Sequence, residues 1–211
     1  KICENKNLIF PGTVIAGSGN SSDIILNYNT KKLRVEIKSK GADYGQKIIH
    51  YKNKKWVWGK PDEITKLYDY MGVFKEISPS FVPRNANHKN LKNWSEIKKK
   101  QISFDEKKFD QSNFEKNNIP CNKQILFNYY AIRDCYYIQI DKSGFYHMKK
   151  DIFNLGTDQF DGEVSLRLRA KSIHNHDPKT SKPTPWWYSF YAVMKLSKSP
   201  KLSEYDLDSS S

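Results

Sequence analysis

The chain has 211 residues, 37% of them hydrophobic and 14% aromatic, which excludes a disordered chain. No apolar run approaches the roughly 20 residues that span a bilayer, which excludes a membrane-spanning helix. Lysine and arginine total 36 against 23 aspartates and glutamates, a net charge of +13 that favours nucleic acid as a partner. Attraction to anionic lipid, or the lysine and asparagine usage of an AT-rich genome, would also explain this charge.

The cysteines indicate the compartment. Cys3, Cys121 and Cys135 form no CxxC pair, so the sequence predicts neither a disulfide framework nor a structural zinc site, and reduced thiols are favoured. No signal-peptide pattern opens the chain. We therefore expect a cytoplasmic protein of a bacterium, phage or virus-infected cell, with no membrane partner. The chain begins at Lys1 rather than methionine, so we expect a start residue or a longer N-terminal piece to be missing from it.

The first expected elements are strands and one helix. Residues 24–29 and 33–39 are β-rich runs joined by "TKK", which predicts a hairpin. The later segment "KIIHYKNKKWVWGK" fits either a short helix and a strand or a second hairpin, with Trp56 and Trp58 on one strand face. "PDEITKLYDYMGVF" has Pro61 at its start, acids in its first turn and apolar residues at helical spacing, so it predicts a helix.

The second half is expected to become compact after a basic stretch. Residues 78–118 are rich in lysine and asparagine and predict a basic insertion or arm, with helical segments around "LKNWSEIKKK" and "FDEKKFD". Beyond it, "QILFNYYAI" is a helix or a strand, and "CYYIQIDKSGFYHM" is a hairpin that turns at "DKSG". "EVSLRLRAKSI" and "WWYSFYAVMKLS" alternate as strands, with the polar loop "HNHDPKTSKPTP" between them. No repeat or linker is evident, so we expect a single domain over 1–211.

The pattern with the clearest chemistry surrounds Glu36. Glu36 and Lys38 share one face of a predicted strand, because side chains alternate between the faces. Asp23 enters the preceding strand, so a hairpin would bring Asp23 and Glu36 together at one end of the sheet. Two adjacent carboxylates repel unless a divalent cation lies between them, and carboxylate oxygens with the carbonyl of Ile37 suit Mg²⁺, with Mn²⁺ as a substitute. The alternatives are a turn cap for Asp23 and a surface ion pair for Glu36 and Lys38.

Asp23 followed by "EIK" at 36–38 resembles the PD-(D/E)xK core of type II restriction endonucleases and of many recombination, repair and phage nucleases. The resemblance covers about residues 17–51. It implies an α/β fold, a central mixed β-sheet flanked by helices, here with additional β-hairpins. It also implies metal-dependent hydrolysis of DNA phosphodiester bonds, in which Asp23 and Glu36 bind magnesium and Lys38 activates the attacking water.

The resemblance extends to Gln46, with departures. Some branches of the family place a glutamine on the helix after the ExK strand, and Gln46 would fill that role in catalysis. Ser22 stands where the family usually has proline. The RecB-like branch has Q-x-x-x-Y, whereas here Gln46 is followed at that distance by His50, with Tyr51 one residue later.

Polar and basic residues in several segments are candidates for DNA contacts. Arg167 and Arg169 share a strand face that could follow a phosphate backbone. The "HNHD" loop could instead bind a metal, but its basic surroundings favour DNA. Trp56, Trp58, Trp186 and Trp187 are interpreted as core and core edge rather than as a base-stacking platform. The candidate DNA-contacting residues are Ser39, Lys40, Arg84, Asn87, His88, Lys89, Arg167, Arg169, His174, Lys179 and Lys182.

The sequence therefore predicts a sequence-specific type II restriction endonuclease acting on double-stranded DNA, and the family resemblance implies a homodimer. One alternative is a recombination, repair or phage nuclease of the same superfamily. The other is a non-catalytic nucleic-acid-binding module in which Asp23, Glu36 and Lys38 are structural.

Overall fold

The computed structural model of the chain describes residues 23–28, 31–84, 104–173, 187–203 and 205, and the fold is given for these residues. The chain forms two compact units, which are described separately. The first comprises Lys1–Tyr44, Pro120–Ser165 and Lys195–Ser211, and the second comprises Gly45–Ile119 and Leu166–Met194. The single domain expected over the whole chain stays a prediction.

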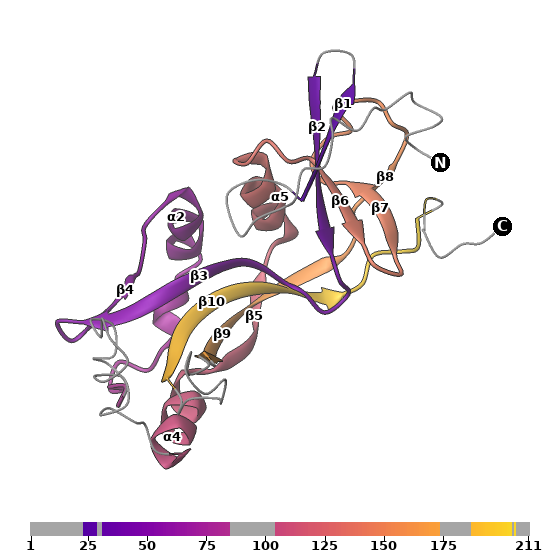
Figure 1. Cartoon of the computed structure of the whole chain (residues 1–211). Helices are drawn as coiled ribbons and strands as arrows, with labels where there is room; N and C mark the ends of the chain where they lie inside the picture. Colours follow the sequence, from indigo (N-terminus) through magenta and orange to yellow (C-terminus); the bar gives the residue numbers. More distant parts are fainter. Residues whose placement is uncertain (1–22, 29–30, 85–103, 174–186, 204, 206–211) are drawn as a thin grey trace, which may run out of the picture. The chain divides into compact units, whose positions relative to one another are not determined.

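The first unit contains a mixed five-stranded sheet in the order β1-β2-β6-β7-β8 (Figure 1). Pairing is antiparallel between β1 and β2, parallel between β2 and β6, antiparallel between β6 and β7, and parallel between β7 and β8. Helix α5 belongs to the same unit. The bounds are β1 Ile24–Tyr28, β2 Lys31–Lys38, α5 Lys123–Ala131, β6 Tyr137–Ile140, β7 Gly144–His147 and β8 Asp158–Gln159. The expected mixed α/β class and the hairpin of β1 and β2 are confirmed.

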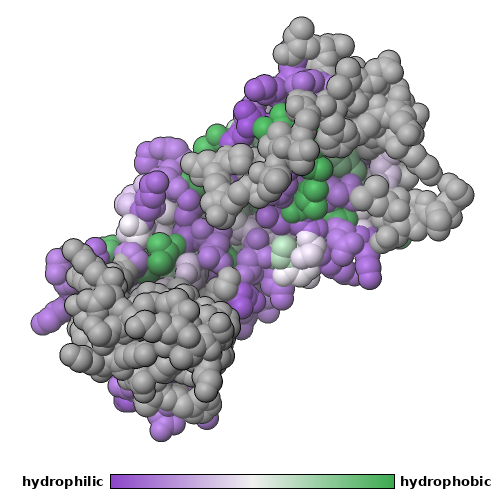
Figure 2. Space-filling model, viewed as in Figure 1, coloured by the Kyte–Doolittle hydropathy of each residue, from purple (hydrophilic) through white to green (hydrophobic). Residues whose placement is uncertain are grey.

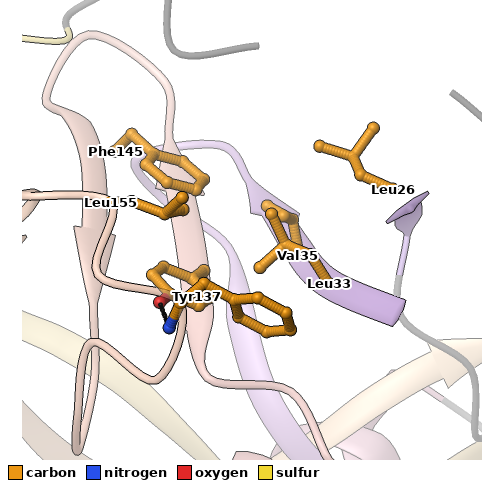
Figure 3. Close-up of a cluster of buried hydrophobic side chains, with 7 residues drawn as sticks. Leu26, Leu33, Val35, Tyr137, Phe145 and Leu155 are labelled. Atoms are coloured by element: carbon orange, nitrogen blue, oxygen red, sulfur yellow. Dashed lines mark hydrogen bonds between the residues drawn. The ribbon is translucent and has the colours of Figure 1, made fainter. Parts of the chain in front are cut away.

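One face of β2 is fixed in the hydrophobic core of this unit. Leu33 and Val35 alternate along the strand, and the hairpin register sets Leu26 opposite Leu33. Figure 3 shows these side chains beside Tyr137 of β6 and residues of the following segments. The cluster comprises Leu26, Leu33, Val35, Tyr137, Phe145, Phe153 and Leu155. Burying each such side chain stabilises the fold by about 1.5–3 kcal/mol, so the orientation of β2 is strongly determined.

The predicted hairpin at "DKSG" is confirmed by β6 and β7. The turn closes with a hydrogen bond from the Ser143 N–H to the Ile140 carbonyl, 3.0 Å long. Gly144 has φ +120°, and a Cβ there would lie 2.5 Å from the Cβ of Ser203. Only glycine satisfies both conditions, since it tolerates positive φ and has no side chain to collide.

The second unit is built on the other five-stranded sheet, in the order β4-β3-β10-β9-β5 (Figure 1). β3 and β4 pair antiparallel, so the second hairpin is the correct reading of "KIIHYKNKKWVWGK". Helices α2 and α4 and the short helix η1 accompany the sheet. The bounds are β3 Asp43–Lys52, β4 Lys55–Trp58, α2 Glu63–Tyr70, η1 Val73–Glu76, α4 Phe104–Phe114, β5 Lys116–Cys121, β9 Glu163–Ile173 and β10 Trp187–Lys198.

Aromatic packing organises this second unit. The Trp56 ring lies 5.2 Å from the rings of both Phe114 and Phe190, measured between centroids. Trp58 lies 4.7 Å from the ring of Phe74 and donates its indole N–H to Asp69 at 2.8 Å. The core interpretation is therefore confirmed for Trp56 and Trp58. It is not tested for Trp186 or for the Trp187 side chain, which lie outside the described residues.

Part of the expected basic arm is folded. The "FDEKKFD" segment forms α4, as predicted, and β5 follows it. Residues 85–103 lie outside the described part of the chain, so an arm or insertion over 78–118 stays a prediction. The polar loop expected between β9 and β10, residues 174–186, also lies outside it.

Hydrophilic residues cover much of the described surface on the face shown in Figure 2, with hydrophobic ones in small groups between them. This agrees with a mean hydropathy of −0.78. None of the described helices is long and apolar enough to cross a membrane. The cytoplasmic location stays a prediction.

Asp62 fixes the start of α2, one residue after Pro61. Its Oδ1 accepts the N–H groups of Ile64 and Thr65, both at 3.0 Å, while the Thr65 hydroxyl accepts the Asp62 N–H at 2.8 Å. Its Oδ2 is paired with Lys47 on β3. Burial works to raise the pKa of Asp62, but Lys47 and the hydrogen bonds outweigh it, so the pKa is lowered.

We expect Asp62→Ala to lower the free energy of unfolding by about 1–2 kcal/mol at neutral pH, because it removes a capping box. Glu63→Ala on the same helix turn, whose ion pair with Lys66 is exposed, should cost about 0.5 kcal/mol or less. Because the folded-state pKa of Asp62 is depressed, its contribution is present above the unfolded-state pKa and is lost as the pH falls through the folded value. Urea denaturation at neutral and acidic pH measures both effects. Equal losses in the two variants would contradict the assignment.

Candidate active site

Asp23 stands at the entrance of β1, where the hairpin brings it to the end of β2. Ile24, the first residue of β1, pairs with Val35, and Asp23 directly precedes it in the chain. The Asp23 Oδ2 accepts the backbone N–H of Ile37 at 2.8 Å, which ties the carboxylate to the ExK strand. The predicted convergence of Asp23 with Glu36 at one end of the hairpin is therefore what the fold produces.

Glu36 is a buried acid paired with Lys38. Glu36 is 7% exposed, and its Oε1 lies 2.6 Å from Lys38 Nζ. The side chains of the pair are only 9% and 21% exposed, so this is not the surface ion pair that a lysine-rich sequence would produce by default. A carboxylate this far from water must be paired, because burying an isolated charge is very costly.

The second contact of Glu36 comes from a residue distant in the sequence. Tyr130, in the last turn of α5, donates its hydroxyl to Glu36 Oε1 at 3.3 Å across a separation of 94 residues. Helix α5 begins at the cap residue Asn122, which accepts the N–H of Gln124 at 2.9 Å. Leu126, Phe127, Tyr129 and Tyr130 are its buried residues. The helix therefore packs Tyr130 inward, against the polar face of β2.

The parallel pairing of β2 with β6 explains how α5 reaches this face. Parallel strands need a crossover connection, and α5 leads directly into β6, whose Ile138 pairs with Glu36. The turn between them is attached to β2, since the Cys135 Sγ contacts the Arg34 carbonyl at 3.5 Å. Arg34 also lies 3.5 Å from Asp134 in an ion pair. These contacts attach the turn after α5 to β2 and so help to position Tyr130 against Glu36.

The negative charge of Glu36 affects the pKa values of three buried groups. Burial first, and then the Glu36 charge, raises the pKa of Tyr130 and of Tyr44, and the same two causes raise the pKa of Cys135 to about 12. Both phenols and the thiol are therefore neutral at physiological pH. Tyr44 is 1% exposed, and among the described residues its hydroxyl has no hydrogen-bond partner.

The groups at this end of β2 are oxygen donors of the kind that magnesium prefers, and a magnesium ion bound by them stays a prediction. Asp23 and Glu36 provide two carboxylates, and the Ile37 carbonyl lies between Glu36 and Lys38 along the strand. Magnesium prefers oxygen ligands, is commonly held by one or two carboxylates and retains several waters. Among the described residues no group of three or more histidine, cysteine or acidic side chains could hold a metal ion, so a metal at this place would have two carboxylates of the chain as ligands.

Gln46 is placed differently from the expectation. It lies on strand β3 rather than on a helix, and its side chain is exposed. The strand forms because the segment after Gln46 pairs with β4, with Ile49 opposite Trp58. The helix expected at Gln46 is therefore wrong. Gln46 belongs to the second unit, and its catalytic role stays a prediction.

The candidate DNA-contacting residues divide into three groups. Ser39 and Lys40 are exposed directly after β2, beside Lys38 in the chain. Three arginines belong to the second unit: Arg84 stacks its guanidinium 4.1 Å above the Phe109 ring, and Arg167 and Arg169 are half-buried on one face of β9. The residues outside the described part of the chain are Asn87, His88, Lys89, His174, Lys179 and Lys182.

Reasoning from the sequence missed Tyr130, Tyr44 and Cys135. The Glu36–Lys38 pair has a local signal in strand alternation, but nothing in "QILFNYYAI" marks one tyrosine as a partner of Glu36. The sequence does show an apolar segment with two tyrosines shortly before a predicted strand. That pattern indicates buried tyrosines but does not identify what they contact.

Comparison with known proteins gives one distant likeness. No protein-family model matches the chain, and no curated protein matches its sequence. The structure aligns with "HhaI endonuclease in Complex with DNA" over 95% of this chain and 86% of that chain, with a TM-score of 0.48 and 12% sequence identity.

We expect Lys38→Met to lower the free energy of unfolding by about 1–3 kcal/mol, because it leaves the buried Glu36 carboxylate without its cation. Lys66→Met is the matched control: the Lys66–Glu63 pair has the same 2.6 Å separation, but its side chains are 71% and 62% exposed. That change should cost about 0.5 kcal/mol or less. Urea denaturation in the absence of divalent metal compares the two. Similar losses would show that burial of the Glu36–Lys38 pair has no energetic consequence.

Proposed function

We propose that this protein is a magnesium-dependent DNA endonuclease of the PD-(D/E)xK class, similar to type II restriction endonucleases. The observation that carries the proposal is the Glu36 carboxylate, 7% exposed, with Lys38 at 2.6 Å and Asp23 at the same end of the hairpin. These contacts support a common site for the two acids and the amine of the motif.

A purely structural role explains this arrangement poorly. A buried ion pair adds little stability compared with hydrophobic residues of similar volume, because its desolvation penalty offsets the attraction. Groups that weaken the fold in this way are typical of functional sites, where chemistry rather than stability determines the residue.

The proposed roles follow from where each group lies. Asp23 and Glu36 would hold the magnesium ion, with the Ile37 carbonyl available as a third oxygen. When bound, a magnesium ion polarises a phosphodiester and neutralises the charge that develops on it. Lys38 would orient the attacking water and take up or release a proton at Nζ, since its ammonium group already lies at the carboxylate end of the site.

DNA binding would rest on the net charge of +13. Contacts to phosphates fix a protein on the duplex and weaken steeply as salt rises. Ser39 and Lys40 are the nearest candidates in the chain, because they follow Lys38 and are exposed. Arg84, Arg167 and Arg169 would add contacts from the second unit, and Gln46 would assist catalysis.

The first test is cleavage of supercoiled plasmid DNA in Mg²⁺ or Mn²⁺, beside a chelator control. We expect wild-type protein to cut, and Asp23→Asn and Lys38→Met to lower the rate by at least about a hundredfold. Lys66→Met removes one positive charge from an exposed pair elsewhere and should cut at nearly the wild-type rate. Circular dichroism at the assay temperature confirms that each variant is folded.

The products distinguish the related activities. Discrete metal-dependent fragments indicate a sequence-specific restriction enzyme. A smear or nicks lost in the same variants keep the chemistry but indicate a recombination, repair or phage nuclease. If no condition gives cleavage, while a salt-sensitive mobility shift persists in chelator, the nuclease proposal is wrong and a non-catalytic binding module takes its place.

A sequence-specific enzyme of this class that cuts both strands commonly acts as a homodimer, and we extend that to this chain. Sedimentation velocity should then give a mass about twice the 24.7 kDa of one chain. A monomer both free and on DNA would refute the dimer without affecting the chemistry.

A further inference from the structure

The two side-chain contacts that the described structure gives to Glu36 both end on the same oxygen. Lys38 Nζ lies 2.6 Å from Oε1, and the Tyr130 hydroxyl donates to Oε1 at 3.3 Å. The two partners differ in kind. Lys38 is a long cation on the same strand, whereas Tyr130 is a rigid neutral group, 1% exposed, on α5.

We propose that Tyr130 is a positioning residue for metal binding: its hydroxyl holds Oε1 of Glu36, so that Oε2 is left for the divalent cation. This inference rests on the proposed function. Lys38 cannot be the permanent anchor of Glu36 if its ammonium group must also serve the attacking water. The Tyr130 hydroxyl takes no part in the proposed chemistry, so it can hold the carboxylate while Lys38 engages the substrate.

The surroundings of Tyr130 suit an anchor. Its backbone carbonyl accepts the N–H groups of Arg133 at 2.9 Å and Cys135 at 3.0 Å, which closes the turn that leads into β6. Because β6 pairs with β2 at Glu36 itself, the turn that follows Tyr130 leads into the strand beside the carboxylate. Groups that hydrogen-bond a metal ligand from behind commonly change metal affinity ten- to a hundredfold, since they order the ligand before binding.

Tyr44 provides the matched control. It is also a tyrosine, is also 1% exposed, and its pKa is also raised by burial and by the Glu36 charge. Within the described residues, however, its hydroxyl makes no hydrogen bond. Tyr44→Phe thus removes a buried oxygen near Glu36 without removing a contact, and Tyr130→Phe removes the oxygen that makes one.

The experiment measures Mn²⁺ and Mg²⁺ binding to the full chain without DNA, by isothermal titration calorimetry. We expect Tyr130→Phe to weaken binding about tenfold and Tyr44→Phe to change it less than about twofold. Thermal unfolding without metal confirms that both variants are folded. In cleavage assays, Tyr130→Phe should need a higher magnesium concentration for half-maximal rate, with the rate at saturating metal within about threefold of wild type.

Each outcome decides the matter. Unchanged metal affinity in Tyr130→Phe, or equal weakening in both variants, overturns the positioning role, because the loss would then not follow the hydrogen bond. A wild-type protein that binds no divalent metal overturns it as well. If metal binding weakens as expected but no DNA is cut under any condition, the positioning role stands and the nuclease proposal fails. If DNA is cut and Tyr130→Phe binds metal like wild type, only the positioning role fails.

Discussion

The constraint on which the site depends is a carboxylate placed inside the protein. Glu36 is 7% exposed and would be expensive to bury without partners. Its position is tolerated because a cation two residues along the strand and a phenol from another element both contact it. Strand β2, helix α5 and the turn that joins α5 to β6 must therefore all be in place before this carboxylate is stabilised. Burial of the Glu36 carboxylate thus depends on several elements of the first unit at once.

β2 performs two tasks at once because its faces differ. Leu33 and Val35 pack into the hydrophobic cluster shown in Figure 3, which fixes the orientation of the strand. The residues between and beyond them, Arg34, Glu36 and Lys38, lie on the other face. A slip of one residue in register would exchange the two sets, so the apolar face also guarantees that the acid and the amine reach the site. The packing of Leu33 and Val35 therefore determines on which face of β2 the Glu36 and Lys38 side chains lie.

Several features of the site are easier to explain by function than by stability. A buried ion pair next to a buried thiol, whose pKa burial raises to about 12, adds little stability to a sheet compared with apolar side chains of similar volume. The Tyr130 phenol and the Cys135 thiol are neutral at physiological pH, because their pKa values are raised. They therefore add no negative charge beside the Glu36 carboxylate. In the proposed nuclease, Glu36 and Asp23 would provide oxygen ligands for the divalent ion.

The sequence by itself determined the features that depend on local pattern. Strand alternation placed Glu36 and Lys38 on one face, the hairpin signal brought Asp23 to them, and the capping and spacing signals located α2, because each requires only residues close in the chain. The tertiary structure alone decided that Glu36 is buried, that Tyr130 contacts it and that Gln46 lies on a strand. The reason is physical: burial and the Tyr130 contact arise from a parallel pairing between segments about a hundred residues apart, and β3 is a strand because it pairs with β4. No local periodicity records such pairings.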